Sequence, residues 1–101
     1  MPYSLRRTRD DVGDSGQMSL AIHLNAGPGD EHVYEHGARP KIGSIIRVGS
    51  PFPRLNSSQD WWQTSPITEI LDEWTETDDD DNLIECVRFK TGNSTYVWKQ
   101  F

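Results

Sequence analysis

Tryptophans and carboxylates gather in the last third of this chain, and both residue types are typical of binding surfaces. All four tryptophans lie between Trp61 and Phe101, and nine carboxylates with no lysine or arginine lie between Glu69 and Glu85. Tryptophan is enriched at the energetic centres of protein interfaces, and a run of like charges favours partners of opposite charge. We therefore expect a site for a basic protein surface, formed by Trp61, Trp62, Glu76, Asp78, Asp79, Asp80 and Asp81.

Other uses of the aromatic residues stay open. Adjacent residues of a strand face opposite sides, so one indole of the pair Trp61 and Trp62 can fill the core while the other faces solvent. Nucleobases or a small ligand could stack on this pair, and an aromatic cage could hold a cationic ligand. The residues of this alternative ligand site would be Arg47, Arg54, Tyr96 and Trp98, beside the two tryptophans.

Metal and catalytic motifs are weak in this sequence. His32 and His36 have the i, i+4 spacing of helical zinc ligands, but Gly29 and Gly37 leave too short a segment for a helix. An EF-hand loop starting at Asp78 would need glycine and glutamate where Leu83 and Phe89 stand. No nucleophile elbow or phosphate-binding glycine loop is present. We expect no enzymatic activity, no cofactor and no metal, although a role of the two histidines in metal binding stays open.

Charge and cysteine content limit the partners and the compartment. Residues 1–54 carry seven basic and six acidic side chains, whereas residues 55–101 carry three basic and ten acidic ones. Such an acidic half repels duplex nucleic acid, which needs clustered lysine and arginine. Cys86 is the single cysteine, which favours a reducing compartment. No apolar run reaches the ~20 residues of a membrane helix, and no signal peptide is visible, so we expect a cytoplasmic protein.

Polarity along the chain predicts an arm and one domain. Residues 1–17 are rich in arginine, aspartate, glycine and serine, and we expect them to form a flexible arm. Residues 18–101 should form a single small β domain, with its core mainly in residues 42–101. A core of this size is near the lower limit of independent stability, so association into a homo-oligomer is also open.

Alternating apolar residues predict several strands. Residues 18–24 and 41–48 show strand patterns, and residues 83–90 and 95–101 flank a Gly-Asn turn, which predicts a β-hairpin. Residues 66–76 are ambiguous. Ile67, Ile70, Leu71 and Trp74 have helical spacing after Pro66, but a bent strand with a bulge at Ile70–Leu71 also fits.

These elements predict a mainly β fold, a small antiparallel SH3-like or OB-like barrel with a flexible N-terminal arm. The function that follows is a non-enzymatic module that binds a basic protein surface. One form of this hypothesis is a virus-encoded inhibitor or decoy of a nucleic-acid-binding complex. The alternatives are a nucleic-acid or small-ligand binder using Trp61, Trp62, Arg47 and Arg54, and a structural subunit of an oligomeric assembly.

Overall fold

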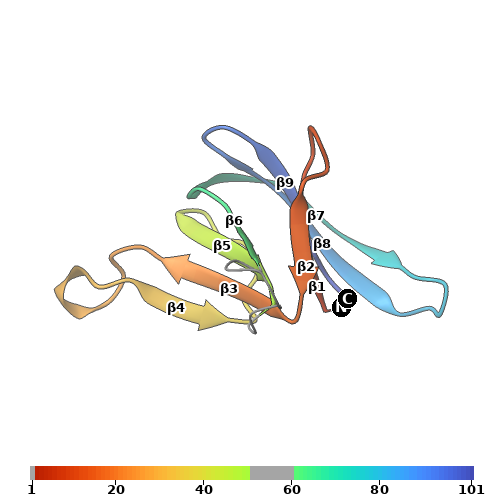
Figure 1. The fold of residues 1–101 in the computed structure, drawn as a ribbon, viewed down its shortest axis with the longest axis horizontal. Helices are drawn as coiled ribbons and strands as arrows, with labels where there is room; N and C mark the ends of the chain where they lie inside the picture. Colours follow the sequence, from red (N-terminus) through yellow and green to blue (C-terminus); the bar gives the residue numbers. More distant parts are fainter. Residues whose placement is uncertain (1, 51–60) are drawn as a thin grey trace, which may run out of the picture.

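The computed structural model describes residues 2–50 and 61–101, and within these ranges the protein is mainly β, as expected. Its strands pair only antiparallel, in two sheets (Figure 1). Sheet A has the order β2-β1-β9-β8-β7, and sheet B has the order β4-β3-β5-β6. The strands are β1 (Tyr3–Arg7), β2 (Gly13–Gly16), β3 (Met18–His23), β4 (Val33–His36), β5 (Ser44–Gly49), β6 (Trp61–Gln63), β7 (Ile67–Thr77), β8 (Leu83–Thr91) and β9 (Thr95–Gln100), with a 3₁₀ turn at Pro28–Asp30.

The described strands do not close into a barrel. Each sheet keeps two edge strands, β2 and β7 in sheet A and β4 and β6 in sheet B. The chain passes from one sheet to the other at Gln17, between β2 and β3. A Cβ atom on Gly16 would lie 2.3 Å from the backbone oxygen of Gly49, so the backbones approach too closely there for a side chain. The SH3-like or OB-like barrel is therefore not found among the described residues.

The core lies between the two sheets. Its largest fully buried side chains are Trp98, Phe89, Leu5, Ile46, Ile67, Val48 and Val87. The predicted hairpin of β8 and β9 is confirmed, and Phe89 stacks on Tyr96 with ring centroids 5.5 Å apart. Trp98 Nε1 donates a hydrogen bond to Ser19 Oγ at 3.0 Å, and Ser19 Oγ donates to the Ala38 carbonyl at 3.0 Å. This chain of bonds joins sheet A to sheet B.

The expected flexible arm is wrong, because residues 3–7 form an inner strand of sheet A. β1 pairs with β2 on one side and with β9 on the other. Leu5 lies opposite Trp98 and is fully buried. The strand's period of two turns Tyr3 and Leu5 toward the core, while Ser4 and Arg6 face outward. Tyr3 and Leu5, together with backbone pairing on both sides, therefore bring this polar segment into the sheet.

The ambiguous segment at residues 66–76 is a strand. β7 pairs with β8, and its register shifts between Ile67 and Glu69 and again between Ile70 and Asp72. The second shift confirms the bulge expected at Ile70–Leu71 and rules out the helix.

Across residues 2–50 and 61–101, no helix has the length and apolar character needed to cross a membrane.

Candidate functional site

The structure separates the residues of the predicted partner site into two groups. Trp61 and Trp62 lie on β6 of sheet B, whereas Glu76 and Asp78–Asp81 lie at the far end of the β7–β8 hairpin in sheet A. Figure 1 shows the turn of this hairpin pointing away from sheet B. The two tryptophans and the acidic run therefore do not form one continuous surface.

The two adjacent tryptophans face opposite sides of β6, as strand geometry predicts. Trp62 packs against the core, and the Arg7 guanidinium carbon lies 5.2 Å from its ring centroid. Trp61 lies on the outer side under Arg47, whose guanidinium carbon is 4.1 Å from the Trp61 ring centroid. Arg47 also donates two hydrogen bonds to Gln63 Oε1, at 2.9 and 2.7 Å. A base stacking on this face of Trp61 would have to displace the arginine.

The other residues of the alternative ligand site are not available at this surface. Tyr96 and Trp98 belong to the core, where they are 6% and 0% exposed. They therefore cannot line a cage for a ligand, and this part of the prediction is wrong. The strand alternation of residues 95–101 was visible, but the face turned inward depends on pairing with β1 and β8. Arg54 lies outside the described residues.

The acidic residues of the β7–β8 hairpin play different structural parts. Glu76 accepts hydrogen bonds from Trp74 Nε1 at 3.1 Å and Lys99 Nζ at 3.0 Å, and these contacts, the Trp74 bond foremost, lower the pKa of its carboxyl. Asp78 accepts from the backbone N–H groups of Asn82 and Asp80, both at 2.9 Å. The Asn82 bond is the main cause of a lowered Asp78 pKa. Asp78 thus orders the turn.

The remaining three aspartates of the turn have carboxylates without a partner among the described residues. Asp79, Asp80 and Asp81 are exposed, and their carboxylates make no hydrogen bond or ion pair with any described residue. Nearby, a shallow cavity of about 290 Å³ is lined by Thr75, Leu83, Glu85, Gln100 and Phe101. Leu83 and Phe101 are 69% and 54% exposed. We call this cavity, together with Asp79–Asp81, the hairpin surface.

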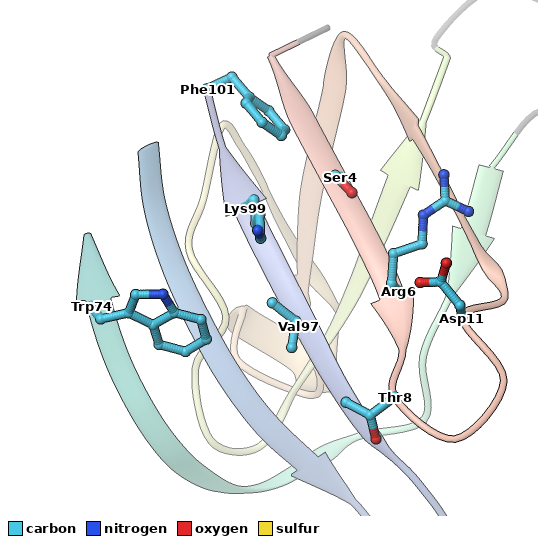
Figure 2. A pocket seen from close by; sticks show the side chains of 8 residues that line it. All are labelled: Ser4, Arg6, Thr8, Asp11, Trp74, Val97, Lys99 and Phe101. Carbon is cyan, nitrogen blue, oxygen red and sulfur yellow. The ribbon is translucent and has the colours of Figure 1, made fainter. Parts of the chain in front are cut away.

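A larger concavity, the outer pocket, lies on the face of sheet A that points away from sheet B. Its volume is about 470 Å³, and Ser4, Arg6, Thr8, Asp11, Trp74, Val97, Lys99 and Phe101 line it. Figure 2 shows the Trp74 indole projecting from β7 toward Val97 and Lys99, with Phe101 at one end and Thr8 at the other. The strand register brings part of this lining together, since Ser4 pairs with Lys99 and Arg6 pairs with Val97.

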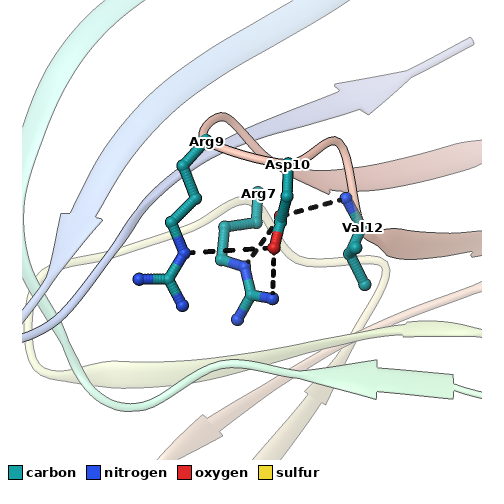
Figure 3. A network of polar contacts seen from close by, with 4 residues as sticks. All are labelled: Arg7, Arg9, Asp10 and Val12. Carbon is teal, nitrogen blue, oxygen red and sulfur yellow. Dashed lines mark hydrogen bonds and ion pairs between the residues drawn. The ribbon is translucent and has the colours of Figure 1, made fainter.

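Of the three arginines in the β1–β2 hairpin, Arg6 is the one whose guanidinium forms no ion pair with a described residue. Its neighbour Arg7 donates to both oxygens of Asp10, at 3.0 and 2.7 Å, and Arg9 lies 4.0 Å from Asp10 Oδ2 (Figure 3). The Arg7 bonds are the main cause of a lowered Asp10 pKa. Within the part of the chain that the structure describes, the Arg6 guanidinium has no ion pair or hydrogen bond, and it lines the outer pocket.

A serine, a histidine and a glutamate form a hydrogen-bonded relay that the sequence did not reveal. His23 Nδ1 lies 2.6 Å from Ser44 Oγ, and His23 Nε2 lies 3.0 Å from Glu35 Oε1. These residues join β3, β5 and β4 in sheet B. A serine nucleophile must reach the carbonyl that it attacks, but Ser44 is only 4% exposed. In this conformation the relay ties three strands together and does not present a nucleophile.

The predicted histidine pair lies on and beside an edge strand. His32 precedes β4 and accepts a hydrogen bond from the Asn25 backbone N–H at 3.2 Å, and His36 ends β4 with an exposed side chain. Among residues 2–50 and 61–101, no three histidine, cysteine or carboxylate side chains lie close enough together to hold a metal ion.

Comparisons with family models, curated proteins and solved structures gave no match to this chain. The outer pocket was missed in the sequence because its residues come from β1, β7 and β9, from the β1–β2 turn and from Phe101 after β9. The only local signal was the alternation of Ser4, Arg6 and Thr8 around Leu5, which marks one polar face of a strand.

Proposed function

We propose that this protein is a non-enzymatic binding module that engages a basic protein surface through the hairpin surface. The observation that carries the proposal is an exposed apolar pair, Leu83 and Phe101, that lines one shallow cavity. Leu83 follows the turn that holds Asp79, Asp80 and Asp81, whose carboxylates have no partner among the described residues. Protein interfaces commonly combine an apolar centre with a polar rim. Leu83 and Phe101 would supply the centre, and Asp79, Asp80 and Asp81 would supply the rim.

Charge determines the class of partner. The chain carries a net charge of −6, and the aspartates of the turn add a local concentration of negative charge. Such a surface speeds association with a cationic partner and disfavours an anionic one. In this proposal Trp61 and Trp62 have no part in the contact, because they lie in the other sheet.

One form of the proposal is an inhibitor or decoy, in which the aspartates take the place of phosphates on a nucleic-acid-binding protein. Its setting would be the cytoplasm, in line with a single, buried cysteine. Virus-encoded inhibitors are one class of protein that would work in this way.

The test compares two pairs of charge-removing substitutions. The variant D79N/D80N removes two charges from the hairpin surface, and the control D30N/E31Q removes two exposed charges at the end of the 3₁₀ turn. The probe is an amphipathic peptide of leucine and lysine, with a leucine–glutamate peptide of equal length as the negative probe. We expect D79N/D80N to slow association with the basic peptide several-fold and added salt to reduce the difference, because exposed charges are screened within about 8–10 Å.

The apolar centre gives a second measurement. Leu83→Ser should speed dissociation of the leucine–lysine peptide while changing its association rate little, since affinity changes at one interface lie mostly in dissociation. Binding that is the same in D79N/D80N and the control, and insensitive to salt, would exclude the hairpin surface as the docking site.

A further inference from the structure

The outer pocket differs in chemistry from the hairpin surface, although Phe101 borders both. We propose that it binds a small ligand in which a planar ring carries one carboxylate group. Its volume of about 470 Å³ lies within the roughly 300–1,000 Å³ usual for small-molecule sites.

The carboxylate would bind at Arg6. A guanidinium presents a planar set of N–H donors that matches both oxygens of a carboxylate. Arg6 has no competing ion pair with a described residue, in contrast to Arg7, which holds Asp10. Ser4 and Thr8 flank Arg6 along the strand and line the same pocket, so their hydroxyl groups can add hydrogen bonds.

The ring would bind against the Trp74 indole and Val97, which Figure 2 shows beside each other in the pocket. Two contacts orient the Trp74 indole, one at its N–H edge and one over its ring. Its Nε1 donates to Glu76, and the Arg88 guanidinium carbon lies 5.3 Å from the ring centroid. Arg88 is held in turn by Asp72 at 3.0 Å. An aromatic wall that is already oriented loses little conformational freedom when a ligand binds.

The charge balance around the pocket favours a monoanion over a dianion. Arg6 and Lys99 are the cations in the lining, and Asp11 is an anion on the same rim. Glu76 adds a second carboxylate, because it binds Lys99 at 3.0 Å. The four charges cancel, so a second negative charge on the ligand would gain no further attraction and would approach a protein that is acidic overall.

Three probes with the same ring separate these contributions: 1-naphthoate with one charge, 1-naphthamide with none, and 1-naphthyl phosphate with nearly two at pH 7.5. Binding is followed by ¹H–¹⁵N spectra of the full chain through the indole N–H signal of Trp74, which the variant Trp74→Phe assigns. We expect naphthoate to shift this signal and to bind more tightly than naphthamide. Naphthyl phosphate should bind no more tightly than naphthoate.

Three variants locate the site. Arg6→Gln should weaken naphthoate binding about tenfold, the loss expected when a charge-assisted hydrogen bond is removed, and should leave naphthamide binding unchanged. Arg9→Gln removes the same charge from the neighbouring turn, outside the pocket lining, and should leave both affinities as in the unmodified protein. Glu76→Gln keeps an acceptor for the Trp74 N–H and frees Lys99, so it should tighten naphthoate binding several-fold.

The spectra also report whether each variant is folded. Equal affinities for naphthoate and naphthamide, an equal loss in Arg6→Gln and Arg9→Gln, or the absence of any shift at Trp74 would each overturn the proposal. Tighter binding of naphthyl phosphate than of naphthoate would also overturn it, because the ligand class would then be a dianion.

Discussion

The two hairpins that flank β9 in sheet A differ in a way that composition does not predict. The β1–β2 hairpin is rich in polar and charged residues, yet its strand β1 is an inner strand and buries Leu5 completely. The β7–β8 hairpin is richer in apolar and aromatic residues, yet its far end leaves Leu83 largely exposed. The position of a hairpin in this protein therefore depends on which few side chains face the second sheet.

The largest expected effect compares one leucine from each hairpin. Leu5→Ala should lower the free energy of unfolding by about 2–5 kcal/mol, because it removes a fully buried side chain and leaves a cavity opposite Trp98. Leu83→Ala should change it by less than about 0.5 kcal/mol, as is usual for exposed positions. Urea unfolding measures both. A loss in Leu5→Ala as small as that of Leu83→Ala would show that the β1–β2 hairpin is not part of the core.

A smaller loss of stability is expected where the end of the β1–β2 hairpin crosses the second sheet at Gly16. Gly16→Ala should cost roughly 1–3 kcal/mol, the usual range for overpacking, because the new Cβ atom would lie 2.3 Å from the Gly49 backbone oxygen. Gly92→Ala is the matched control in the turn after β8, where a Cβ atom would meet nothing within 4 Å. Thermal unfolding should separate the two variants clearly. A Gly16→Ala protein as stable as the control would refute the close crossing.

The smallest effect concerns acid and salt, and it contrasts the turns of the two hairpins. Folding lowers the pKa of Asp10 and of Asp78 below the ordinary value of 3.8. The stabilisation from each carboxylate is therefore fully present above about pH 4, the usual aspartate range, and is lost as the pH falls through the folded-state pKa. Asp10→Asn and Asp78→Asn should each reduce the loss of unfolding free energy between pH 5 and pH 3.

Salt distinguishes the two carboxylates. Asp10 depends mainly on the Arg7 guanidinium, whereas Asp78 depends on backbone N–H groups. Added salt should therefore diminish the contribution of Asp10 more than that of Asp78. Unfolding curves of Asp30→Asn, a substitution on the loop before β4, control for the change in net charge. An acid response in Asp10→Asn that parallels the unmodified protein at all salt concentrations would contradict this account.

The sequence predicted the elements whose signal is local. The β8–β9 hairpin was visible in the alternation on both sides of Gly92-Asn93, and the bulge in β7 was one of two readings for residues 66–76. The pairing of β1 with β9 was not visible, because it joins residues from opposite ends of the chain. Leu5 could not be assigned to the core without that register, so residues 1–17 looked like an arm.

The candidate sites likewise include features with a local sequence signal and features that depend on long-range strand pairing. The acidic run was evident in the sequence, but its separation from Trp61 and Trp62 depends on two sheets that no local pattern reveals. The two tryptophans were expected to face opposite sides, and they do, with Trp62 against the core and Trp61 under Arg47. The outer pocket could not be predicted, because Arg6 and Trp74 lie on β1 and β7, and only the order of strands in sheet A puts them on one face with β9 and β8 between them.

The indole N–H of Trp98 donates a hydrogen bond to Ser19 across the two sheets. The hydrogen-exchange rate of this one proton therefore reports how often the two sheets separate. The indole N–H of Trp98 is buried and bonded across the core, so solvent deuterium can replace it only when sheet A moves away from sheet B. Its exchange rate would follow that opening alone, without contributions from fraying at the hairpin ends. Ligands of either candidate surface could then be ranked by how far they slow this one exchange.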